Sequence, residues 1–187
     1  MLSGQQPISG CQRFLLCLTG IIRHKPSHTV ITGIVMDLAS LEAEAATLIL
    51  PHFDEAAALR LGMILVGLAK DLPVVINIRN AHRTFFHVAL PGSAAMNDNW
   101  ARRKGNTALM TGRASLIVGR MNLEKRRTLA TDGLAEADYA DHGGAVPIIV
   151  ADVGLVAVAA VSGLPQVEDH QLVVRGILAL LKELMPG

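Results

Sequence analysis

Residues 142–166 read HGGAVPIIVADVGLVAVAAVSGLPQ, a long apolar run in which Asp152 is the only charged residue. Length and hydropathy alone would suit a membrane-spanning helix, but the composition favours strands. Residues 146–150 and 155–161 are rich in β-branched side chains, which suit a pleated, packed surface. A central Asp-Val-Gly supplies turn chemistry, and Pro147 is tolerated at the start of a strand. We therefore predict a buried β-hairpin and no membrane span.

Outward from this hairpin, apolar periodicity predicts a second hairpin and several helices. Strict alternation over residues 74–79 and 84–90 is typical of two strands joined by a turn. Helices are predicted over residues 37–46, 54–70, 93–112, 114–125 and 165–184, with Asp37 and Asp54 as caps and an edge strand within 47–53. This order predicts the α+β class, with an antiparallel sheet of about five strands flanked by helices.

Composition sets the limits of size, charge and assembly. A chain of 187 residues fits one domain with a sizeable core. The formal net charge of +1 gives no field that would attract nucleic acid. Hydrophobic residues make up 51% but aromatic residues only 3%, so some of the small apolar surface is expected at a subunit interface. We predict a homo-oligomer, at least a dimer.

Three groups of residues resemble the haem-degrading domain family, the GlcG/HbpS-like proteins. They are the loop and hairpin of residues 142–166, the segment Asn99–Lys104 and the segment Asp169–Val174. The resemblance spans about residues 36–187 and is greatest to an uncharacterised bacterial branch of the family. It implies a profilin-like/GlcG-like single domain and the binding of haem or a related tetrapyrrole, without implying haem degradation as an activity.

Because a fold does not fix chemistry, two other functions stay open. One is a small-molecule enzyme that uses His142 as a general acid or base. The other is a non-catalytic oligomeric accessory subunit whose surfaces matter more than any pocket. The cofactor is accordingly haem or none. No Walker-type or Gly-x-Gly-x-x-Gly loop supports nucleotide binding.

The N-terminal residues 1–35 differ from the rest of the chain. Arg13 precedes a short apolar run, and no acidic residue occurs before Asp37. A signal peptide, a mitochondrial-type presequence and a start codon assigned too early are all compatible with this pattern. We predict that the domain spans residues 36–187 and that residues 1–35 are an extension outside it. Only Cys11 and Cys17 are cysteines, which is typical of a cytoplasmic protein.

The first predicted ligand site is His142-Gly143-Gly144. Glycines let a backbone approach a ligand closely and can present consecutive N–H groups to an anion. The histidine beside them could bind iron or transfer a proton. The alternative is that the two glycines only let the chain enter the hairpin.

A second group of predicted ligand residues is Asn99, Trp100, Arg102 and Arg103 on one helix, followed by Lys104. Arginines can hold carboxylates such as haem propionates with two parallel hydrogen bonds. The alternative is a solvated helix face with Trp100 as a core or interface anchor.

A haem iron needs an axial ligand, an apolar wall and cations for the propionates. We predict His142 as the ligand, with His87 in reserve, and residues 146–149 as the apolar wall. A lone strand histidine such as His87 is more often structural. His52 and His170 are expected to make local hydrogen bonds only.

Overall fold

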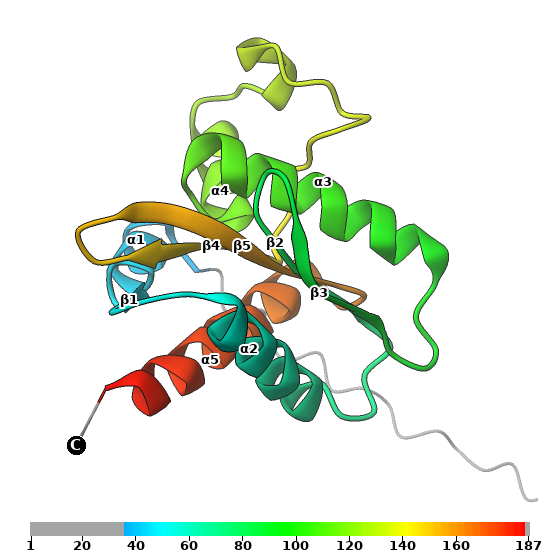
Figure 1. Cartoon of the computed structure of the whole chain (residues 1–187). Helices are drawn as coiled ribbons and strands as arrows, with labels where there is room; N and C mark the ends of the chain where they lie inside the picture. The colour runs from blue at the N-terminus through cyan, green and yellow to red at the C-terminus, as the bar shows by residue number, and fades with distance from the viewer. Residues whose placement is uncertain (1–35, 186–187) are drawn as a thin grey trace, which may run out of the picture. The chain divides into compact units, whose positions relative to one another are not determined.

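The central layer is a five-stranded sheet with the order β1 (Ile49–Leu50), β4 (Ala145–Val150), β5 (Gly154–Ser162), β2 (Val75–Arg79) and β3 (Thr84–Ala89) (Figure 1). The structure is a computed structural model that describes residues 36–185, which belong to one compact unit. The hairpin predicted within residues 142–166 is present as β4 and β5, and its turn places Asp152 at a left-handed φ of 59°. The α+β class is therefore confirmed.

One strand pairing differs from the predicted antiparallel sheet. β1 runs parallel to β4, with Ile49 opposite Ile149, so the sheet is mixed. β1 is only two residues long, and the alternation of two residues carries no information about strand direction. The remaining pairs, β4–β5, β5–β2 and β2–β3, are antiparallel as predicted.

The helices begin and end close to the predicted residues: α1 (Leu38–Ala46), α2 (Glu55–Leu68), α3 (Ala95–Thr111), α4 (Ser115–Glu124) and α5 (Gln166–Leu184). Two predicted caps are present, since Asp37 accepts from the backbone N–H of Ser40 and Asp54 from that of Ala57, both at 2.8 Å. A short 3₁₀ helix, Leu129–Asp132, lies in the long connection from α4 to β4. Within residues 36–185, no helix combines the length and apolarity needed to cross a bilayer.

The helices form two layers on opposite faces of the sheet. α2 and α5 contact each other and cover one face, whereas α3 lies across the other face, over β5 and β4 (Figure 1). Alternate residues of each central strand serve the two faces: Ile76 faces α2 and α5, and its neighbour Val75 packs with alanines of α3. The strand period of two thus divides the protein into two separate cores.

Among the described residues, the outer edge of β4 does not pair with a strand over its first residues, where Ser115 and Pro147 take the place of strand hydrogen bonds. The backbone N–H and C=O of Ala145 both bond the hydroxyl of Ser115, at 3.1 and 3.3 Å. Pro147 has no N–H, and the register with β5 places it in a non-hydrogen-bonded pair, so its carbonyl points away from β5. β1 begins to pair only at Ile149. A gap therefore remains in the sheet edge beside Pro147.

The predicted N-terminal extension lies outside the described residues, as do Cys11 and Cys17. The domain boundary at residue 36 and the cytoplasmic location stay predictions.

Candidate functional site

A buried ion pair lies beneath the loop that carries His142. The Nζ atom of Lys104 donates to Asp169 Oδ2 at 2.9 Å and to the carbonyls of Gly143 at 3.0 Å and Val161 at 2.7 Å. Both charged side chains are only 3% exposed. These bonds use all three ammonium protons, so Lys104 ties α3, β5 and α5 to the loop rather than lying on a solvated helix face.

Burial disfavours the charged form of both Lys104 and Asp169, and so moves their pKa values in opposite directions. Loss of solvent lowers the pKa of Lys104, although the charge and hydrogen bond of Asp169 oppose that change. Burial raises the pKa of Asp169, against the effect of Lys104 and of the backbone N–H groups of Leu164 and Gly163. The pair is therefore held in place by the packing around it, at a cost in desolvation.

The two glycines after His142 each lie so close to a neighbouring group that a side chain would not fit. A Cβ on Gly144 would overlap the Nζ of Lys104 and the carbonyl of Val161, and Gly144 also has a φ of 123°. A Cβ on Gly143 would overlap the carbonyl of Gln166, whose side-chain Oε1 accepts the N–H of Gly143 at 3.2 Å. The predicted anion nest therefore has at least one of its N–H groups already bonded within the protein.

The side chain of His142 projects from this fixed loop into solvent. It is 57% exposed, and its ring meets the ring of Trp100 edge-on, with centroids 5.1 Å apart and planes at 62°. Its Nδ1 lies 3.7 Å from Asp141 Oδ1, which is too long for a hydrogen bond. The other oxygen of Asp141 accepts from Asn122 at 2.7 Å, so the carboxylate beside the imidazole is itself anchored.

Three adjoining hollows share His142 in their walls. The first, of about 240 Å³, reaches Trp100 and the Lys104–Asp169 pair, and the second, of about 250 Å³, lies beside Trp100 and Arg103. The third, of about 190 Å³, is bordered by Arg120. Each is smaller than most pockets for drug-sized ligands. Together they make His142 the common centre of an open, polar site.

Two arginines beside these hollows have unused donors. The guanidinium of Arg103 lies 4.5 Å from the centre of the Trp100 ring, a cation–π contact. The Nε atoms of Arg103 and Arg120 are buried and have no hydrogen-bond partner among residues 36–185. Arg103 borders the second hollow and Arg120 the third, so an anion bound there would meet a guanidinium.

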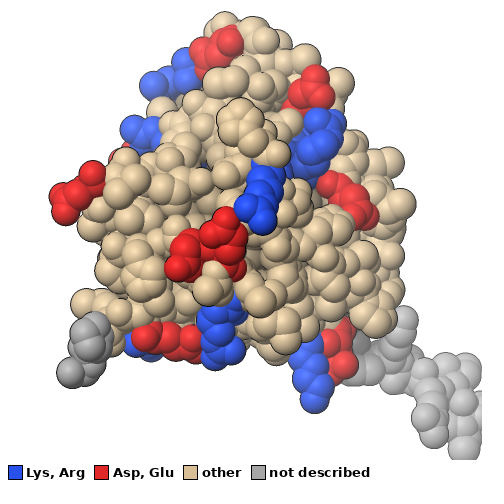
Figure 2. Space-filling view, viewed as in Figure 1, with Lys and Arg blue, Asp and Glu red and all other residues tan. Residues whose placement is uncertain are grey.

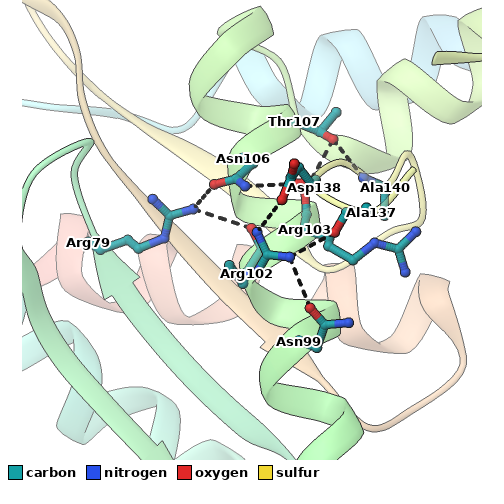
Figure 3. Close-up of polar contacts among 9 residues, drawn as sticks. All are labelled: Arg79, Asn99, Arg102, Arg103, Asn106, Thr107, Ala137, Asp138 and Ala140. Atoms are coloured by element: carbon teal, nitrogen blue, oxygen red, sulfur yellow. Dashed lines mark hydrogen bonds and ion pairs between the residues drawn. The ribbon is translucent and has the colours of Figure 1, made fainter. Parts of the chain in front are cut away.

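Arg102 is engaged in a different way from Arg103. Its guanidinium donates to Asp138 Oδ1 at 3.0 Å, to the Ala137 carbonyl at 2.8 Å and to Asn99 Oδ1 at 3.1 Å (Figure 3). These bonds fasten the connection between α4 and β4 to α3. The predicted ligand-binding role of Arg102 and Asn99 would require breaking them.

The same connection is held at two further points. Asn106 donates to the Asp138 carbonyl at 2.8 Å and accepts from Arg79 at 2.5 Å (Figure 3). The hydroxyl of Thr107 accepts the backbone N–H of Ala140 at 3.0 Å. Side chains along one helix thus position the segment that leads directly into His142.

The other haem contacts predicted from the sequence lie elsewhere. Both ring nitrogens of His87 have partners, Asp98 at 2.9 Å and Asn77 at 3.1 Å, so iron binding there would displace a bond. Val146 and Ile148 are buried in the core under α2 and α5. The expected apolar wall is therefore absent from the His142 site, because alternate residues of β4 face the opposite layer.

Asp169 and the burial of Lys104 were missed in the sequence, although a signal for both exists. Lys104 falls at helical spacing between Ala101 and Ala108, both buried on the inner face of α3. Asp169 has the same spacing from Val173 on α5. Two opposite charges on inward faces predict a buried pair, since neither is stable alone. The nearness of Trp100 to His142 has no comparable signal in the sequence.

Charge on the surface is mixed. The face in Figure 2 carries lysine and arginine beside aspartate and glutamate, in small groups separated by uncharged residues. That face shows no extended basic area of the kind that binds a nucleic-acid backbone.

The sheet order, the helix layers and the glycine loop define the GlcG/HbpS-like class of α+β folds. The chain belongs to the family described as "Haem degrading protein HbpS-like", whose sequence model matches residues 53–178. A UPF0303 protein of Paraburkholderia phymatum is 42% identical over 151 residues, which cover 79% of this chain and 92% of that protein. The uncharacterised bacterial branch predicted from the sequence is thereby confirmed.

Solved structures share the fold. The crystal structure of the Ybr137w protein has a TM-score of 0.70 and 30% identity, covering 78% of this chain and 89% of that one. The structure of a PduOC:heme complex has a TM-score of 0.60 and 19% identity, covering 68% and 94%. At that identity the second likeness shows the fold alone.

Proposed function

We propose that this protein binds haem or a related tetrapyrrole at the open site around His142. The observation that carries the proposal is an exposed imidazole on a rigid loop, next to an aromatic ring and two arginines with unused donors. Membership of the HbpS-like family supports it, as does the haem complex of PduOC, which has the same fold.

The residues present fit two of the three needs of haem, the axial ligand and the cations, and Trp100 adds one aromatic ring where the apolar wall is missing. His142 offers a ring nitrogen as the axial donor, and the anchored carboxylate of Asp141 lies 3.7 Å from its Nδ1. Arg103 and Arg120 can hold the propionates, and Trp100 offers a ring face or edge to the macrocycle. Bound haem would supply an iron centre whose reactivity depends on this axial ligand.

A haemin titration of the full chain tests the proposal. We expect a saturable, shifted Soret band at about one haem per subunit, or per subunit pair if the site lies at an interface. His142→Ala should weaken or alter the spectrum, while His52→Ala, in the exposed connection between β1 and α2 and outside the walls of the three hollows, should leave it unchanged. A broad spectrum of adsorbed haemin in the wild type would contradict haem binding. If His142→Ala leaves the haem spectrum unchanged and His87→Ala no longer binds haem, only the assignment of the axial ligand is wrong.

The homo-oligomer predicted from composition also belongs to this proposal. Leu59 and Met63 lie one turn apart on α2 and are 56% and 54% exposed, an apolar stripe suited to a subunit contact. Light scattering behind size-exclusion chromatography should give at least twice the mass of one chain at micromolar concentration. The mass of a single chain would contradict the assembly.

A second candidate function is acid–base catalysis on a small molecule, favoured by the anchored Asp141 beside the imidazole of His142. Histidine is the side chain that most often transfers protons in enzymes, and a small shift of the ring would bring Asp141 within hydrogen-bond reach. Thermal stabilisation by one organic acid from a metabolite library, lost in His142→Ala, would support an enzyme. Stabilisation by no member of the library would favour the non-catalytic accessory subunit.

A further inference from the structure

A further hollow, larger than the three beside His142, does not include this histidine. Its volume is about 470 Å³, within the usual range for small-molecule pockets. It lies between α1, the junction of α3 and α4, and the free edge of β4, and His170 of α5 also borders it. Its apolar walls include Leu41, Leu48 and Ile117. This hollow, called the α1 cavity below, has no part in the proposed haem site.

The inner polar groups of the α1 cavity are hydrogen-bond acceptors. His170, only 2% exposed, bonds Glu44 Oε1 through Nε2 at 2.8 Å, and Gln171 donates to Glu44 Oε2 at 2.9 Å. The Nδ1 atom of His170 is buried and has no partner among residues 36–185. In the neutral ring, with the proton on Nε2 facing Glu44, Nδ1 is an acceptor. The carbonyl of Pro147 faces the same gap.

Glu44 remains a carboxylate in this setting. Burial raises its pKa, but the hydrogen bonds from His170 and Gln171 outweigh burial, and its pKa lies below the usual value of 4.5. Each of its oxygens keeps a second lone pair for a further donor.

The mouth of the cavity is crossed by one ion pair. Arg113 donates to Glu42 Oε1 at 3.0 Å, and both side chains are about half exposed. With Glu44 counted, two carboxylates face one guanidinium. The last turns of α1 and α3 also line the cavity and favour positive charge, while the first turn of α4 opposes them. With the ring of His170 neutral, the carboxylate that no arginine faces gives the cavity a negative field.

We propose that the α1 cavity binds a small organic cation, an amine with a compact apolar body. The apolar walls take the body, and the ammonium donates to Glu44 at the inner end or to Glu42 at the mouth. An acceptor-rich cavity matches a ligand that only donates, whereas a carboxylic acid of the same shape would meet two carboxylates.

Three ligands of similar shape and different charge test which charge the α1 cavity prefers: benzylamine, benzyl alcohol and benzoate. Each is added to the full chain. Ligand-detected NMR should show saturable binding of benzylamine, weaker binding of the alcohol and the weakest binding of benzoate. Glu44→Gln should weaken benzylamine about tenfold, the loss expected for one hydrogen bond to a charged group, and leave benzyl alcohol unchanged.

Two alanines of α1 provide a matched steric test. Ala46→Phe places a ring at the cavity and should abolish binding of all three probes, while Ala43→Phe, on an exposed position outside the cavity, should not change it. Equal binding of benzoate and benzylamine would overturn the proposal, as would a benzylamine affinity that survives Ala46→Phe. Absence of saturable benzylamine binding to the wild type would also overturn it.

Discussion

The two faces of the sheet are built from the same strands but have different interiors. The face under α2 and α5 is packed with leucine, isoleucine and valine. The face under α3 is packed with valine and small alanines, and it also holds Asn77, Lys104 and Thr107. Small side chains let a helix lie close to a sheet, and the polar groups then reach across to neighbouring loops. The first face therefore buries more of the large apolar side chains, and the second positions the His142 site.

The largest expected effect follows from cutting the buried ion pair on the α3 side. Lys104→Met leaves Asp169 buried without a cation and should lower the free energy of unfolding by about 3–5 kcal/mol. Urea denaturation measures the loss. The double variant Lys104→Met/Asp169→Asn removes both charges and keeps an oxygen for the N–H of Leu164, so it should recover part of the stability. A single variant as stable as the wild type would mean that the pair is not desolvated.

Adjacent residues of β2 compare the two faces directly. Ile76 and Val75 are both fully buried, but Ile76 faces α2 and α5 while Val75 faces α3. Ile76→Ala should cost about 2–5 kcal/mol. Val75→Ala removes two carbons and should cost about 1.6 kcal/mol at ~0.8 kcal/mol per CH₂ group. Equal losses in chemical denaturation would contradict the difference between the faces.

The smallest effect concerns Glu44 and His170, a polar pair on the otherwise aliphatic side. The pKa of Glu44 is lowered in the folded state, so its contribution is fully present above about pH 4.5 and is lost as the pH falls through the folded pKa. Glu44→Gln should lose about 1–2 kcal/mol near pH 7 and show a flatter acid limb below pH 4.5. Urea midpoints measured along a pH series test this. If stability falls with pH in the variant as steeply as in the wild type, protonation of Glu44 is not the cause of the acid destabilisation.

Much of the fold could be predicted because its signals are local. The caps Asp37 and Asp54, the Asp-Val-Gly turn and the alternation in β2 each act within a few residues of one another. The direction of β1 could not be predicted, since a two-residue strand is placed entirely by its neighbour β4. The segment after α4 also gave no signal, because much of its order comes from side chains of α3.

The site was only partly predictable for a related reason. His142 and Trp100 were identified by residue type, and they do meet. The structural role of Arg102 could not be predicted, because one of its hydrogen-bond partners is the backbone carbonyl of Ala137. Every residue has such a carbonyl, so the sequence does not indicate which one is bonded. The role of Gly144 was likewise hidden until the Lys104 ammonium beside it was located, and the role of Gly143 depends on the backbone carbonyl of Gln166.

The proline in the sheet edge has a consequence for how copies of this chain can associate. Along β4, Ser115 occupies the polar groups of Ala145 and Pro147 lacks an N–H, so an incoming strand would find no donor there until β1. β1 gives it only two residues, too few to template a ladder. The β1–β4 edge of the sheet is thus a poor template for a strand from another copy of this chain.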